Sequence, residues 1–255
     1  MYHQFIFRPL YNGLVYLMDI LPWIDIGIAV VIFTVVVKFV LYPLSKSSLL
    51  TQVRMKEIEP EVNKIKAQYA KDRQTQTMKI MALYKEKKVK PFSGILLVFI
   101  QLPILFALIS VFYKVIPTVD PTLLYSFVSP PEVKTLFLGF IDLTQKSLLL
   151  SVLTGVIQYA QLHFSLSGKP PAALAPGQAH DFSTQMATSM SKQMKFLVPI
   201  IAFASTYWLI PAQFPQAASI IAIYWSVSSL FTLAQELWIR HQYKKRGQIV
   251  NQLIS

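Results

Sequence analysis

Residues 30–44 read VVIFTVVVKFVLYPL, and this apolar stretch decides the fold because it places one lysine, Lys38, inside a segment that can enter a lipid bilayer. A helix needs about 20 apolar residues to cross the hydrocarbon core, and residues 24–44 supply them. A lysine in the middle of such a helix costs about 2.5 to 3.5 kcal/mol even on mild insertion scales. That cost has to be offset by water, by a partner or by the membrane surface.

The composition of the whole chain is that of an integral membrane protein. Of its 255 residues 54% are hydrophobic and only 14% are charged, with a mean hydropathy of +0.47, well outside the range of soluble domains. The net charge of +12 therefore belongs in the loops, where it can meet anionic lipid or nucleic acid. The absence of cysteine excludes disulfides and thiolate metal sites.

No cofactor, metal or enzymatic chemistry is expected. The four histidines, at positions 3, 163, 180 and 241, lack metal-ligand spacing. A phosphate-binding G-x-x-x-x-G-K-[ST] loop is absent from the sequence too. We therefore expect no nucleotide-driven step and no hydrolase.

Five apolar stretches approach the length of a membrane-spanning helix, which predicts an all-α fold with five transmembrane helices. They are residues 24–44, 91–113, 147–166, 194–210 and 217–238. The last two are separated by PAQFP at residues 211–215, which allows only a tight turn.

The basic residues predict the orientation. Residues 45–90 carry 12 lysines and arginines against five acidic residues, so the positive-inside rule places this segment in the cytoplasm. Alternation then puts the amino terminus and the 114–146 loop outside. It leaves the 167–193 loop and the basic tail, residues 239–255, in the cytoplasm.

Two further segments have helical periodicity. In residues 45–90 the apolar residues recur at helical spacing on both sides of residues 70–76, which predicts an antiparallel helical hairpin; its lysines can bind partners or simply solvate it. Residues 1–23 lack the features of a cleaved signal peptide and suit an amphipathic helix lying in the external membrane interface; a solvated leader is the alternative. Residues 167–183 are rich in Pro, Ala and Gly, as in a loop.

Polar residues inside the predicted spans are the candidate functional residues. The main ones are Lys38, Gln101, Gln158 and Gln161. The first four spans contain no Asp or Glu apart from Asp25, which lies at the opposite end of the first span from Lys38. Lys38 therefore either snorkels about 9 Å to the end of its span or faces Gln101 and Gln161 across a hydrated cavity. A glutamine taken alone is explained by an interhelical hydrogen bond of about 0.6 kcal/mol.

Longer motifs resemble a known family. The runs VVVKFVLYPLSKSSLL, MALYKEKKVKPFSGILLVFIQLPILFAL and AIYWSVSSLFTLAQELWIRHQYKKRG are similar to those of the YidC family of membrane protein insertases. The resemblance covers nearly all of residues 24–247. It implies a five-helix core around a hydrophilic groove, open to cytoplasm and lipid, that inserts nascent membrane proteins.

The resemblance also implies residue roles and partners. Lys38 falls on the basic groove residue, which is usually arginine, and Gln161 falls on the groove glutamine. Tyr224 and Trp225 fall on an aromatic pair that contacts the substrate. The clients would be nascent membrane proteins, with the ribosome, the Sec translocon and membrane lipids as candidate partners. The large extracytoplasmic domain of some members and the long basic tail of others are not in this sequence.

Two rival functions use the same residues. A small-solute transporter or channel would be favoured by an internal repeat and by Gly-broken helices, neither of which is evident. A structural scaffold would bind partners through the basic hairpin and leave Lys38 without a role. A bacterial plasma membrane is the expected location, since no Arg- and Ser-rich transit peptide is present.

Overall fold

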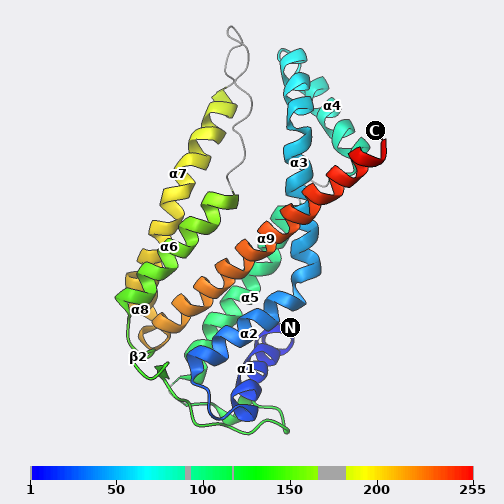
Figure 1. The fold of residues 1–255 in the computed structure, drawn as a ribbon. Helices are drawn as coiled ribbons and strands as arrows, with labels where there is room; N and C mark the ends of the chain where they lie inside the picture. Colours follow the sequence, from blue (N-terminus) through cyan, green and yellow to red (C-terminus); the bar gives the residue numbers. More distant parts are fainter. Residues whose placement is uncertain (1, 90–92, 117, 166–181, 255) are drawn as a thin grey trace.

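The computed structural model describes residues 2–89, 93–116, 118–165 and 182–254. Helices dominate, as the sequence predicts. Within the described residues the sheet structure is one antiparallel pair, β1 (Leu136–Phe137) and β2 (Ile141–Asp142). The β pair and the α3–α4 hairpin lie at opposite ends of the molecule (Figure 1).

The first apolar stretch forms a bent helix rather than one straight span. α2 (Ile26–Val40) begins at Asp25, whose carboxylate accepts a hydrogen bond from the Ile28 amide at 2.9 Å. After Val40 the chain bends by 62° and continues as α3 (Tyr42–Gln68). Pro43 follows the bend, where a missing amide donor is tolerated because it belongs to the first turn of a helix.

α3 continues into the basic segment and packs there against α4 (Arg73–Glu86). α4 begins at Asp72, whose carboxylate accepts bonds from the amides of Gln74 and Thr75. The Thr75 hydroxyl also donates to this carboxylate, and these bonds hold the pKa of Asp72 below its usual value. A small apolar cluster joins the helices; it consists of Ile58, Val62, Leu83 and Val89. These helices occupy the segment in which a hairpin is expected.

The remaining long helices are built around the longest one. They are α5 (Ser93–Val115), α6 (Leu148–Ser165), α7 (Phe182–Ala204) with its extensions η3 (Ser205–Leu209) and α8 (Ile210–Gln213), and, after the turn η4 (Pro215–Ala217), α9 (Ala218–Ile254). α9 contacts α2, α3, α5 and α6. In Figure 1 it runs diagonally between the α6–α7 pair and the helices of the amino-terminal half.

Two predicted loops are partly helical. Residues 182–193, expected in a cytoplasmic loop, belong to α7, and residues 239–254, expected in a basic tail, continue α9. The rest of the predicted loop, residues 167–181, lies outside the described residues. The basic end of α9 is thus carried on a continuous helix from the apolar body.

The amino-terminal helix packs into the protein core. α1 (Arg8–Ile20) follows a π-helical turn, η1 (His3–Phe7). Tyr11, Leu14 and Val15 are fully buried where α1 meets α2 and α5. The apolar face of the expected amphipathic helix is therefore buried against protein, while its position in the membrane interface remains a prediction.

The loop after α5 is fastened to α1 by buried polar groups. Asn12, which is 2% exposed, donates to the carbonyl oxygen of Leu123 at 3.0 Å and accepts from the amide of Tyr125 at 2.6 Å. The short 3-10 helix η2 (Pro121–Leu123) lies at this contact. The loop thereby becomes part of the folded body.

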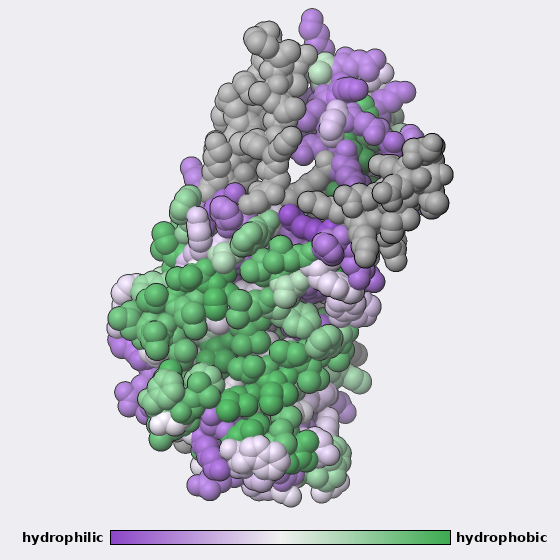
Figure 2. Space-filling model, viewed as in Figure 1, coloured by the Kyte–Doolittle hydropathy of each residue, from purple (hydrophilic) through white to green (hydrophobic). Residues whose placement is uncertain are grey.

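An apolar band lies across the helical body. Figure 2 shows it on one face as a continuous hydrophobic surface, with polar residues at the α3–α4 end and at the opposite end. Among the described residues three helices are long and apolar enough to cross a membrane: residues 148–165, 193–213 and 219–242. The bent α2–α3 pair makes a fourth if it counts as one span, and residues 101–115 of α5 form a shorter apolar helix. The protein is a multi-pass membrane protein, and the five-span count remains a prediction.

Candidate functional site

Polar side chains from α2, α5 and α6 converge on two turns of α9. We call this group, formed by Lys38, Gln101, Gln158, Gln161, Tyr224, Ser229 and Thr232, the α9 polar belt. The residues on α9 span eight positions, about 12 Å along the helix axis. The belt lies within an otherwise apolar body, so each of its polar groups has to be satisfied by a partner or by water.

Lys38 reaches the belt from the last turn of α2. Its Nζ donates a hydrogen bond to Oγ1 of Thr232 at 3.3 Å, and both residues are half-buried. Among the described residues no carboxylate lies within salt-bridge distance of this ammonium group. The structure therefore places a cation inside the apolar body beside a neutral partner.

Gln101 reaches α9 from α5. Its Nε2 donates to the hydroxyl of Tyr224 at 3.3 Å. The Tyr224 ring is only 4% exposed and packs on Phe112, with 5.9 Å between ring centroids. The hydroxyl group, rather than the ring, is what Tyr224 contributes to the belt.

The glutamines of α6 approach a different face of α9. Oε1 of Gln158 accepts from the hydroxyl of Ser229 at 2.8 Å, and its Nε2 donates to Oε1 of Gln161 at 3.2 Å. One turn away, the hydroxyls of Thr154 and Ser226 are bonded at 2.9 Å. These contacts line the buried interface along which α6 and α9 pack.

The belt follows α9 part of the way around its axis. At about 100° per residue, Thr232 lies about 80° from Tyr224 and about 60° from Ser229, whereas Tyr224 and Ser229 are about 140° apart. Gln101 and Gln158 therefore approach α9 from well-separated directions, and Lys38 approaches between them. Gln161 is joined to the group through Gln158, and a hydrated cavity that contains Lys38, Gln101 and Gln161 remains a prediction.

Glu236, the acidic residue nearest the belt in sequence, is bonded to residues outside the belt. Glu236, 4% exposed, is hydrogen-bonded to Arg240 and to the hydroxyl of Ser165 on α6. Arg240 also donates to the Ser165 carbonyl oxygen at 3.0 Å. Because the Glu236 carboxylate is bonded to Arg240 and to α6, it does not neutralise the charge of Lys38.

One expected residue, Trp225, is partly packed into the core, and two residues in or near the belt were not predicted. Trp225 is half-buried and packs against the apolar core. Thr232 and Thr154 were not among the candidate residues, although Thr232 follows Ser228 by one turn and so extends a polar face of α9. No group of three or more His, Asp or Glu side chains that could hold a metal occurs in the described part of the chain.

Comparisons with known proteins agree on one family. Residues 17–246 match the model of the 60Kd inner membrane protein family. A membrane protein insertase YidC of Fusobacterium nucleatum is 29% identical over 218 residues, which cover 84% of this chain and 86% of that protein.

Longer bacterial relatives of the same name match only in part. The membrane protein insertase YidC of Haemophilus influenzae strain PittEE is 29% identical over 248 residues, which cover 95% of this chain but 38% of that protein. The membrane protein insertase YidC of Rickettsia massiliae is 26% identical over 220 residues, which cover 84% of this chain but 35% of that protein. The chain thus spans little more than a third of the length of these two relatives.

Proposed function

The chain belongs to the YidC family of 60Kd inner membrane proteins, and from this premise we propose that it is a membrane protein insertase. It assists insertion and folding of nascent membrane proteins through a positively charged groove that opens to the cytoplasm and to lipid. The observation that carries the proposal is the half-buried Lys38 ammonium, which has a hydroxyl group as its partner. A cation kept in an apolar body at this cost is suited to a polar segment that passes by.

The mechanism is electrostatic. A carboxylate costs about 2.5 to 3.5 kcal/mol at the centre of a membrane helix. An opposite charge 4 Å away recovers about 4 kcal/mol at an effective dielectric constant of 20. Lys38 can therefore offset most of the cost of bringing an acidic client segment into the membrane. The client's apolar helix then moves sideways into lipid.

The amides of the belt serve the uncharged part of the client. Gln101 and Gln161 offer donors and acceptors to the backbone of a short segment in transit, which has no helix of its own to satisfy it. Gln158, which is bonded to Ser229 and to Gln161, holds Gln161 in place. Tyr224 holds Gln101 in place through its hydroxyl. Trp225 is the aromatic contact for the client helix.

The direction of transport follows from charge. We propose that the α3–α4 hairpin and the end of α9 are cytoplasmic and that the amino terminus is outside, in a bacterial plasma membrane. The energy comes from partitioning of the client and from the membrane potential, which is worth about 2.3 kcal/mol per charge for each 100 mV. The ribosome and the Sec translocon are proposed partners of the basic hairpin.

Disulfide crosslinking tests whether clients pass the belt. The chain has no cysteine, so Gln161→Cys and the control Ile200→Cys each supply a unique thiol. Ile200 lies on α7 and is 61% exposed. A ribosome-bound client with one cysteine in its first span should crosslink at position 161 and not at 200. Equal crosslinking at both positions would contradict a path along the belt.

A further inference from the structure

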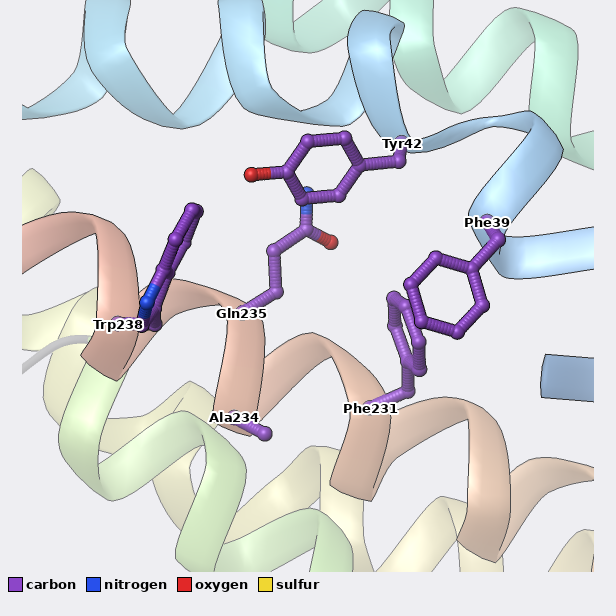
Figure 3. A pocket seen from close by; sticks show the side chains of 6 residues that line it. All are labelled: Phe39, Tyr42, Phe231, Ala234, Gln235 and Trp238. Carbon is purple, nitrogen blue, oxygen red and sulfur yellow. The ribbon is translucent and has the colours of Figure 1, made fainter.

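A second feature lies at the bend between α2 and α3. Between the bend and α9 is a hollow of about 330 Å³, which we call the aromatic slot. Figure 3 shows the side chains that line it: Phe39, Tyr42, Phe231, Ala234, Gln235 and Trp238. The slot is separate from the hydrogen bonds of the α9 polar belt and is almost wholly apolar.

The aromatic rings form two pairs, one further along α9 than the other. Phe39 and Phe231 meet edge to face, with 5.2 Å between ring centroids, and Tyr42 and Trp238 lie 6.3 Å apart. Trp238 follows Phe231 by seven residues, about 10 Å along α9 toward its basic end. The phenylalanines therefore lie deeper in the apolar band, and the two rings with polar groups lie toward the α3–α4 end. This is the order in which aromatic residues meet a lipid leaflet.

A cation lies at the shallow end of the slot. Nζ of Lys46 is 5.9 Å from the ring centroid of Tyr42, one turn further along α3. Arg240 is close in sequence to Trp238, but it is paired with Glu236 on the α6 side. Among the side chains that the structure describes, the charge at the shallow end of the slot is therefore that of Lys46, which favours an anionic ligand.

The walls are fixed and one side is open. Nε2 of Gln235 donates to Oγ of Ser45 at 2.7 Å, which joins α9 to α3 behind the slot. Phe39 is 62% exposed and Trp238 is 47% exposed. A flexible chain can enter from the surrounding lipid without displacing either helix.

We propose that the aromatic slot binds one acyl chain of an anionic phospholipid, from the leaflet on the α3–α4 side, with its phosphate at Lys46. An apolar slot with a cation at its shallow end matches a molecule with an apolar chain and one anionic head. A bound lipid would fill the angle left by the bend and hold α2 against α9 near Lys38. This site is separate from client binding and does not depend on insertase activity.

Fluorescence quenching of Trp238 tests the site without any client. The chain has four tryptophans, so Trp23→Phe, Trp208→Phe and Trp225→Phe together leave Trp238 as the only one. This protein is reconstituted in vesicles that contain brominated phosphatidylglycerol or brominated phosphatidylcholine at equal mole fraction. We expect the anionic lipid to compete for the slot about fivefold better, the preference that one lysine near an anionic headgroup gives.

Three variants separate the slot from general lipid contact. Lys46→Gln should bring the two lipids to equal quenching, whereas Lys46→Arg should keep the preference. Lys64→Gln, a change at an exposed lysine four to five turns further along α3, should also keep it. Ala234→Leu should fill the slot and reduce quenching by both lipids.

Three results would overturn the proposal. The first is equal quenching by the two lipids in the parent protein, and the second is a preference that survives Lys46→Gln. The third is weak quenching by both lipids in the parent, which would reject a lipid occupant and favour a client segment in the slot.

Discussion

The hydroxyl of Thr232 on α9 accepts a hydrogen bond from the ammonium group of Lys38 on α2, at 3.3 Å. The contact joins residues 194 positions apart. It fixes where the positive charge lies within the apolar body. The proposed function depends on that position, because attraction between charges falls with distance.

Removing the Thr232 hydroxyl should weaken insertion while leaving Lys38 in place. A hydrogen bond to a charged group contributes about 1.5 to 3 kcal/mol, so Thr232→Val should free the ammonium to turn toward the membrane surface. Insertion of an acidic client should fall several-fold, measured as the protease-protected fraction in vesicles. Thr232→Ser keeps the hydroxyl and should behave as the parent. Equal protected fractions for Thr232→Val and Thr232→Ser would exclude a role for this bond.

Gln158 and Ser229 should be energetically coupled. Polar pairs between membrane helices are worth about 0.6 kcal/mol on average and about 1.7 at most. A double-mutant cycle with Gln158→Ala and Ser229→Ala, read from unfolding free energy in detergent, should give coupling in this range. The matched cycle with Gln158→Ala and Ser226→Ala should give almost no coupling, because Ser226 is bonded to Thr154. Equal coupling in the two cycles would contradict the contact.

The Glu236–Arg240 pair should stabilise the α6–α9 interface. Removing one partner of a buried pair costs about 3 to 5 kcal/mol, and the partly exposed arginine puts the expected loss near the lower limit. Glu236→Gln should therefore lower the melting temperature. The double variant Glu236→Arg with Arg240→Glu, in which the two charges are swapped, should recover part of the lost melting temperature. An unchanged melting temperature for Glu236→Gln would show that the pair adds nothing to the stability of the protein.

Asn12 should hold the loop between α5 and α6 on α1. In Asn12→Leu the Leu123 carbonyl and the Tyr125 amide lose their partner, which costs about 1 to 3 kcal/mol for each buried group. Hydrogen exchange of the Tyr125 amide should accelerate. Asp19→Asn is the control, because Asp19 bonds the Ser129 amide at an exposed site. Unchanged exchange in Asn12→Leu would mean that the loop is held by other contacts.

The sequence identifies the polar residues but not their partners. Hydropathy alone places Lys38, Gln101 and Gln161 in apolar segments, because an ionic or amide group is conspicuous there. Whether they meet depends on the rotation of each helix about its axis, which packing sets, and for this reason Thr232 was missed. Composition also cannot distinguish lipid from protein as the partner of α1's apolar face. Residues 239–254 are polar enough to suggest a tail, although nothing in them prevents α9 from continuing.

The most direct test of the central claim is the insertion of a single-span client whose short external segment is acidic, compared with a neutral version of it. The parent, Lys38→Arg, Lys38→Leu and the control Lys114→Leu, at an exposed lysine of α5, are reconstituted in vesicles. Initial rates of protease protection are then measured. We expect Lys38→Leu to slow the acidic client about tenfold, equivalent to about 1.4 kcal/mol, and the neutral client much less. Lys38→Arg and Lys114→Leu should match the parent. Equal rates for the acidic client with Lys38→Leu and the parent would contradict a groove that works through this charge.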